Sequence, residues 1–83
     1  MKITITVRNK NTRKSYDIAL DNRQKIATTI QVLRECLPRA MEGIGEKYEI
    51  RSERTGRRLS AEDTYERQQI FTGDALLVNS LEG

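Results

Sequence analysis

The sequence predicts an α+β domain in which one helix packs across one face of a mixed sheet of four to five strands. Residues 25–37 carry apolar side chains at helical spacing, and no other stretch has a comparable stripe. The remaining apolar residues mostly alternate with polar ones, which is typical of strands. A chain of 83 residues has room for one such core. We expect one domain over residues 1–80, with residues 81–83 as a short C-terminal tail or a remnant of expression.

The helix expected at residues 25–37 has a narrow apolar stripe. At about 100° per residue, four side chains fall on one side of the helical wheel, namely Ile26, Ile30, Leu33 and Leu37. Pro38 should end the helix, because its ring clashes with the preceding turn and it has no N–H to donate. Asp21 or Asn22 is expected to cap the helix N-terminus. A loop should follow to residue 47, with one helical turn at 39–42.

Two alternating stretches at the start of the chain predict an antiparallel hairpin. They cover residues 2–8 and 15–20 and are separated by the polar turn 9–14. Period-two alternation of β-branched residues is the usual pattern of a half-buried strand. The side chains expected to be buried on one face are Ile3, Ile5, Val7, Ile18 and Leu20.

Three further strands are expected after the helix. Residues 47–55 form the third, residues 57–59 a very short fourth, and residues 75–79 an apolar central strand beside and parallel to the first. Between them Ser60 is a candidate cap. Tyr65 and Ile70 should point inward, which would turn Phe71 outward.

The residue types argue against an enzyme. The chain has no histidine, so no Ser-His or Cys-His pair exists, and its single cysteine, Cys36, has no disulfide partner. We expect no catalysis, cofactor, metal or small-molecule substrate. For Cys36 the sequence favours a partly buried filler over a reactive thiol. No stretch is apolar enough to span a membrane or to act as a signal peptide, so we expect the chain to stay where it is made.

The charged residues leave two interpretations open. Net charge is only +3, but basic residues cluster at the hairpin turn and around the third and fourth strands. These two groups are Arg8, Lys10, Arg13 and Lys14, and Arg51, Arg54, Arg57 and Arg58. They could form a patch suited to an acidic protein surface, or a solvated face balanced by Glu49 and Glu53. Nucleic-acid binding is a weaker alternative, because aromatic residues make up only 5% of the chain.

The order of elements resembles the ubiquitin-like β-grasp fold. The resemblance is carried by Leu59, by Ile70 eleven positions later, and by the Gly73-Asp74 turn that leads to Leu76. Within that fold the chain looks most like the bacterial YukD/EsaB proteins associated with type VII (WXG-type) secretion. The similar segments are Tyr16-Asp17-Ile18-Ala19-Leu20, Lys25-Ile26 and Gly73-Asp74-Ala75-Leu76. The resemblance implies a cytoplasmic, non-catalytic module that acts through protein contacts.

Two departures from ubiquitin bear on function. Ubiquitin and the sulfur carriers end in a Gly-Gly tail that is activated by adenylation, whereas Glu82 precedes the final Gly83 here. A carrier activated at its C-terminus is therefore the second hypothesis. The positions that match ubiquitin's apolar recognition patch are Arg51 and Asn79, so receptors for that patch should not bind. Our candidate partner-binding residues are Arg8, Arg51, Arg54 and Phe71. Phe71 alone would more commonly be an isolated exposed side chain.

Overall fold

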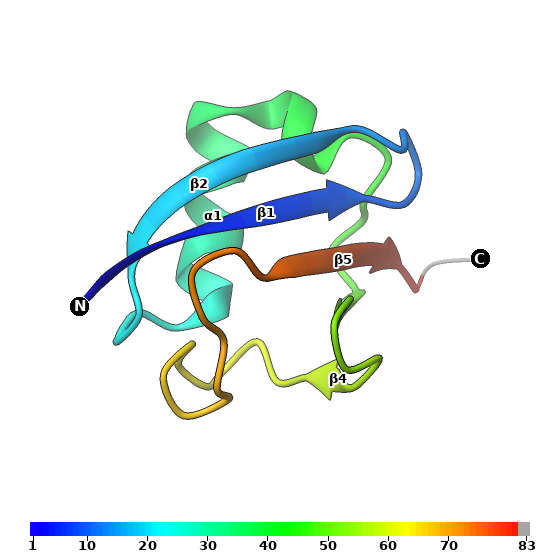
Figure 1. The fold of residues 1–83 in the computed structure, drawn as a ribbon. Coiled ribbons are helices and arrows are strands. Elements are labelled where there is room, and N and C mark those ends of the chain that lie inside the picture. Colours follow the sequence, from blue (N-terminus) through cyan, green and yellow to red (C-terminus); the bar gives the residue numbers. More distant parts are fainter. Residues whose placement is uncertain (82–83) are drawn as a thin grey trace.

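A computed structural model describes residues 1–81 and shows one five-stranded sheet with a helix packed against one face (Figure 1). The elements are β1 (Lys2–Asn9), β2 (Ser15–Asp21), α1 (Ile26–Cys36), the 3-10 helix η1 (Pro38–Met41), β3 (Tyr48–Ser52), β4 (Arg58–Leu59) and β5 (Ala75–Ser80). The strand order is β2-β1-β5-β3-β4. β1 and β5 are parallel, and the other pairs are antiparallel. The expected fold class and the parallel central pair are confirmed.

The alternation in β1 sets which side chains enter the core. Ile3, Ile5 and Val7 are buried, and β2 faces them in the register Ile3↔Leu20 and Ile5↔Ile18. Leu20 is buried as expected, but Ile18 is only half-buried. The reason is its place on an edge strand, where the core covers the side chain from one side only.

The apolar stripe of α1 is one residue shorter than the sequence predicted. Ile26, Ile30 and Leu33 are buried, whereas Leu37 is 37% exposed and lies beyond the last helical residue. Pro38 accounts for this difference, because a proline disfavours helical geometry in the residue before it. Leu37 accordingly has φ −142° and ψ 67°.

The helical turn expected at 39–42 exists as η1, which begins at Pro38. Its Ala40 and Met41 are 0% and 3% exposed, respectively. They belong to the same core cluster as the stripe of α1, so η1 supplies the apolar groups that Leu37 was expected to provide.

The prediction of a side-chain cap at the start of α1 was wrong. No side chain caps the helix. Instead the N–H of Ile26 donates to the carbonyl of Asp63 (3.2 Å) and the N–H of Ala27 to that of Ala61 (2.7 Å). The segment after β4 therefore satisfies the helix end through its main chain. The Asp21 carboxylate binds Arg23, and the Asn22 amide oxygen accepts a hydrogen bond from the N-terminal amine.

The segment between β4 and β5 covers the core beside the N-terminal end of α1. Tyr65 and Ile70 are 0% and 2% exposed, which confirms their inward placement. Burial raises the pKa of the Tyr65 hydroxyl to about 12. Ser60 makes no cap through its hydroxyl; the Gln68 side chain binds its main-chain N–H and C=O instead.

A buried polar side chain joins the hairpin turn to η1. Asn9 is fully buried, and its amide nitrogen donates to the carbonyls of Ala40 (3.2 Å) and Glu42 (2.9 Å). Its amide oxygen accepts from the N–H groups of Asn11 and Thr12. All of the usual hydrogen bonds of a primary amide are thus made. Among residues 1–81, no helix is long and apolar enough to cross a membrane.

Candidate functional site

The face of the sheet opposite α1 is where the predicted partner-binding residues gather. The strand alternation that sends Leu76 and Val78 inward turns Leu77 and Asn79 outward. Leu77 is paired with Arg8 on one side and with Arg51 on the other, and Asn79 is paired with Glu49. The expected outward placement of Arg51 and Asn79 agrees with this register. Leu77 was overlooked, although its position between two buried residues would have identified it.

Arg8 is fixed across the outer face rather than extended into solvent. Its Nε donates to the Ser15 hydroxyl on β2 (2.9 Å) and its Nη1 to the Glu53 carboxylate just after β3 (2.5 Å). Since Arg8 lies on β1, next to β2, its side chain links β2 to the segment after β3 across the outer face. Its guanidinium therefore has a defined position but is already paired with a carboxylate.

Arg51 and Arg58 share one carboxylate. Glu49 accepts Nε of Arg51 at 3.2 Å and lies 3.7 Å from Nε of Arg58. Arg51 also donates to the carbonyl of Gly56 (3.1 Å) at the turn between β3 and β4. The positive charge on this side of the face is thus partly balanced, as the second interpretation of the basic residues proposed.

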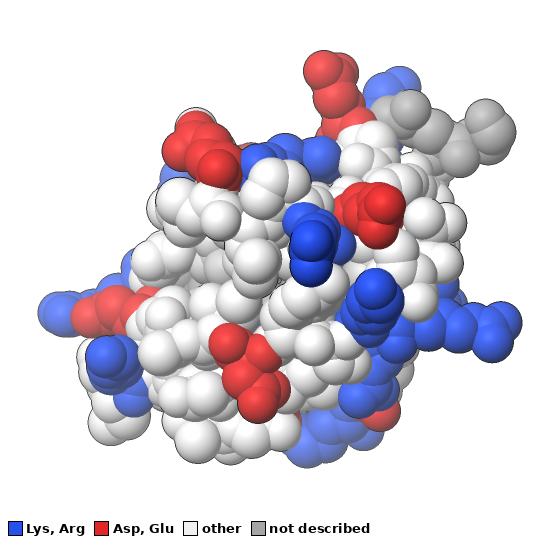
Figure 2. Space-filling view, turned by 90° about the horizontal axis from the view of Figure 1, so that it is seen from above, with Lys and Arg blue, Asp and Glu red and all other residues white. Residues whose placement is uncertain are grey.

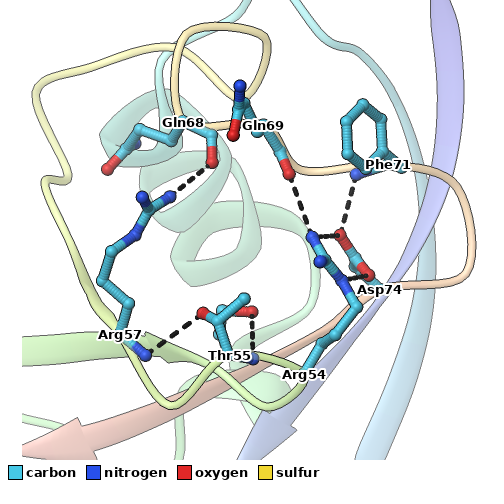
Figure 3. Close-up of polar contacts among 8 residues, drawn as sticks. Arg54, Thr55, Arg57, Gln68, Gln69, Phe71 and Asp74 are labelled. Atoms are coloured by element: carbon cyan, nitrogen blue, oxygen red, sulfur yellow. Dashed lines mark hydrogen bonds and ion pairs between the residues drawn. The ribbon is translucent and has the colours of Figure 1, made fainter.

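Arg54, Asp74 and Phe71 form a compact cluster at the end of the outer face (Figure 3). Arg54 binds both oxygens of Asp74, at 2.9 and 3.2 Å. Asp74 also accepts the N–H of Phe71 (2.9 Å), and the guanidinium carbon lies 5.7 Å from the centre of the Phe71 ring. The hydrogen bonds from Arg54 hold the pKa of the Asp74 carboxyl below its ordinary value. Phe71 is 59% exposed, so its expected outward position is confirmed.

Two consecutive carbonyls of the neighbouring loop are held by arginines. Arg54 donates to the carbonyl of Gln69 (3.2 Å) and Arg57 to that of Gln68 (2.7 Å), as Figure 3 shows. Gln69 has φ 58°, a left-handed conformation that is uncommon for residues other than glycine. These hydrogen bonds fix the loop that carries Phe71, so the exposed ring is attached to a main chain with a defined position.

The remaining basic residues lie at the hairpin turn. Figure 2 shows Lys and Arg gathering on its right-hand side, where the β1–β2 turn lies in Figure 1, while both signs mix elsewhere. Arg13 adopts φ 66° within this turn. In the part of the chain that the structure describes, no carboxylate pairs with Lys10, Arg13 or Lys14. Among the described residues, the first predicted basic group is therefore split, with Arg8 paired to Glu53 and its three turn residues unpaired, whereas Arg51, Arg54 and Arg58 of the second group are all paired.

Cys36 is exposed, which corrects the expectation of a partly buried filler. It is the last residue of α1, where the chain turns toward Pro38, so neighbouring side chains do not cover it. Over residues 1–81 the structure has no pocket and no group of three His, Cys, Asp or Glu side chains that could hold a metal. The hypothesis about activation at Gly83 concerns a residue outside this range.

Solved structures with the same arrangement identify the fold. A de novo designed protein based on ubiquitin matches with a TM-score of 0.75 and 18% identity, covering 99% of this chain and 92% of that one. The chain has the ubiquitin-like β-grasp fold. The EccD5 ubiquitin-like domain from Mycobacterium xenopi matches this ubiquitin-like chain with a TM-score of 0.75 and 14% identity, covering 100% and 98% of the two chains.

A plant ubiquitin-like domain is similar to the same extent. The ubiquitin-like domain of an Arabidopsis thaliana protein matches with a TM-score of 0.74 and 13% identity, over 99% of this chain and 80% of that domain. No protein-family model and no curated protein matches the chain. The structural likeness therefore defines the fold of this ubiquitin-like domain, and its specific role must be argued from its own surface.

Proposed function

We propose that this ubiquitin-like domain is a non-catalytic protein-interaction module that docks a protein partner through the outer face of its sheet. Arg8, Arg51, Arg54 and Phe71 are the residues we assign to this contact. We further propose that the domain works in the bacterial cytoplasm as an accessory of type VII (WXG-type) secretion.

The observation that carries the proposal is that Phe71 is exposed while hydrogen bonds fix the loop to which it belongs. A rigid aromatic side chain loses little conformational freedom on binding, and aromatic and arginine side chains dominate the energetics of many interfaces. Phe71 is 59% exposed although Asp74 and Arg54 hold its backbone and ring in place. Such a group is prepared to enter an apolar pocket on a partner without first being ordered.

The outer face adds a small apolar centre with a polar rim. Leu77 lies between Arg8 and Arg51, whose guanidinium groups are held by Glu53 and Glu49. Interfaces commonly combine an apolar centre with charged groups at the rim, where paired charges orient the partner more than they add affinity. Most of the inner face is covered by the core, with Tyr16 and Ile18 of β2 only partly buried, so the outer face is the broad surface left for contacts.

Two likenesses support the assignment to type VII secretion. The first is the resemblance to YukD/EsaB proteins at Tyr16–Leu20, Lys25-Ile26 and Gly73–Leu76. The second is the match of the whole chain to the EccD5 ubiquitin-like domain. Neither depends on the residues assigned to the docking face, so the secretion assignment and the docking face can be tested separately.

Site-specific photo-crosslinking in cells tests the proposal. A photoreactive phenylalanine analogue replaces Phe71 in the full chain, and crosslinked proteins are identified by mass spectrometry. We expect one dominant adduct with a cytosolic or membrane-associated component of the secretion system. The matched control carries the analogue at Thr28, which is exposed on α1 away from the sheet.

The result depends on the contrast between the two positions. The two substitutions Phe71→Ala and Arg51→Glu are tested separately, in a pull-down that uses the chain as bait. Each should reduce the amount of the same partner that is recovered, and Phe71→Ala should reduce it by about ten-fold. Equal adducts from positions 71 and 28, or recovery unaffected by both substitutions, would show that the outer face is not the docking site. A dominant adduct unrelated to secretion would leave the docking face in place and refute the secretion assignment.

A further inference from the structure

β2 presents an open row of main-chain hydrogen-bonding groups. In the β1–β2 pair, Asn22 donates to the carbonyl of Met1 and Asn9 to that of Lys14, both at 2.9 Å. Antiparallel pairing alternates, so the even-numbered residues of β2 face β1 and the odd-numbered ones face outward. Ser15, Asp17 and Ala19 therefore direct their N–H and C=O groups away from the sheet. Within residues 1–81, no hydrogen bond reaches these main-chain groups.

Apart from the charges of Asp17 and Asp21, this edge lacks the features that usually prevent strand addition. β2 pairs regularly with β1 over seven residues, without a proline or a bulge. The opposite edge strand, β4, is only two residues long. Short edges, prolines and bulges are the common protections against edge pairing, so the two edges of this sheet differ sharply.

The inner side of β2 is also incompletely covered. Tyr16 and Ile18 are partly buried side chains that pack against the core cluster, whereas Leu20 on the same face is buried. A strand added beside β2 would cover the exposed parts of Tyr16 and Ile18. Main-chain pairing and apolar burial would thus act together.

We propose that the β2 edge binds a second copy of this chain, in an antiparallel pair that joins two sheets into one of ten strands. The residues whose N–H and C=O groups point away from the sheet must lie opposite the same kind of residue in the second copy. This condition allows only every second register. One register pairs all seven residues and sets Ile18 opposite its own copy on the two-fold axis. In this register Tyr16 lies opposite Leu20, Asp17 opposite Ala19, and Ser15 opposite Asp21.

Charge selects this register over its neighbours. A shift of one hydrogen-bonded step in one direction sets Asp17 directly opposite Asp17 of the second copy. A shift in the other direction sets Asp17 opposite Asp21 twice. Like charges directly opposite each other in a strand pair are destabilising. Larger shifts place Ile18 opposite polar residues outside β2. Only in the register centred on Ile18 does every apolar side chain on the inner face of β2 lie opposite another apolar side chain.

The surroundings of the edge are compatible with this pairing. β2 is the uppermost strand in Figure 1, and Figure 2, which views the molecule from above, shows Lys, Arg, Asp and Glu scattered among uncharged residues, with a gathering of one sign only at the right-hand side. The two-fold axis runs perpendicular to the sheet, so both copies keep their outer faces on the same side. The docking face proposed above remains open in the dimer, and the two proposals stand independently.

Sedimentation equilibrium of the full chain tests the dimer. We expect the average mass to rise from the monomer value of 9.6 kDa toward twice that value. Because one strand pair is a small interface, we place the dissociation constant at about 100 μM. Ala19→Lys brings an opposite charge to Asp17 of the second copy at both symmetric positions and should tighten the dimer about five-fold. Ala19→Asp should weaken it to a similar extent, and Ala19→Pro, which removes an outward N–H, should abolish it.

Thr4 provides the matched control, because it is paired with Ala19 on the same outer face but lies one strand further in. Thr4→Lys and Thr4→Asp make the same changes in net charge and should alter the dissociation constant less than about two-fold. Circular dichroism of each variant verifies folding. A wild-type chain that stays monomeric at about 1 mM, or a dimer that responds equally to charges at positions 4 and 19, would overturn the proposal.

Discussion

Asn9 shows how one polar side chain can fix the position of two segments. Its amide is fully buried. It binds the carbonyls of Ala40 in η1 and of Glu42, which follows η1, and the N–H groups of Asn11 and Thr12 in the hairpin turn. The sequence offered little sign of this role, because an asparagine beside a polar turn is normally a surface residue. Its burial depends on where η1 lies in space, which no local pattern determines. The same turn is packed closely enough that a Cβ on Gly43 would overlap the Asn11 side chain.

Replacing Asn9 by aspartate tests that role with almost no change in shape. A carboxylate has no donor, so the carbonyls of Ala40 and Glu42 would face an acceptor and a buried charge. We expect Asn9→Asp to lower the free energy of unfolding by about 3 kcal/mol at neutral pH, measured by urea denaturation. Gln31→Glu makes the same chemical change on the exposed side of α1 and should alter stability by less than about 0.5 kcal/mol. Equal effects of the two substitutions would contradict the role assigned to Asn9.

At the scale of elements, local periodicity predicted the strands and the helix well, and contacts distant in sequence account for the differences. β1 and β2 match the alternation, each ending one residue later than expected. The start of α1 was assigned the wrong kind of cap because its partners, Ala61 and Asp63, lie far along the chain. For the candidate site, the outward positions of Arg51 and Phe71 followed from alternation. The pairing of Arg8 with Glu53 and of Arg54 with Asp74 required the assembled sheet.

The end of α1 gives a direct comparison of two leucines from one predicted stripe. Leu33 is 4% exposed, whereas Leu37 is 37% exposed beside Pro38. We expect Leu33→Ala to lower the free energy of unfolding by about 3 kcal/mol, because it removes apolar contacts and leaves a cavity. Leu37→Ala should cost less than about 1 kcal/mol. Chemical denaturation followed by far-ultraviolet circular dichroism measures both, and similar losses would mean that Leu37 does belong to the core.

At the scale of the whole molecule, one small core leaves most polar residues to balance one another at the surface. The ion pairs of the outer face join segments distant in sequence, such as Arg8 with Glu53 and Arg54 with Asp74. Exposed pairs of this kind add little stability each. The Arg54–Asp74 pair differs because Asp74 is largely buried and also accepts the N–H of Phe71. Loss of charge on Asp74 should therefore affect both the stability of the domain and the order of its exposed aromatic.

This coupling predicts how the stability of the domain depends on pH. Hydrogen bonds from Arg54 lower the pKa of Asp74 in the folded state, and those from Arg23 lower that of Asp21. A carboxyl with a lowered folded pKa binds fewer protons folded than unfolded, so its stabilising contribution is present above the unfolded pKa of about 3.9 and is lost as pH falls below it. We expect the free energy of unfolding to fall between about pH 5 and pH 2.

Asp74→Asn should flatten part of that fall and lower stability at pH 7 by about 1–2 kcal/mol, since an amide offers only one acceptor oxygen to Arg54 and Phe71. Glu35→Gln, at an exposed position of α1, serves as the control for removing one carboxyl. Urea denaturation at a series of pH values measures both variants against the wild-type chain. If Asp74→Asn and the wild-type chain lose stability in parallel over the whole acid range, Asp74 is not the group whose protonation weakens the fold.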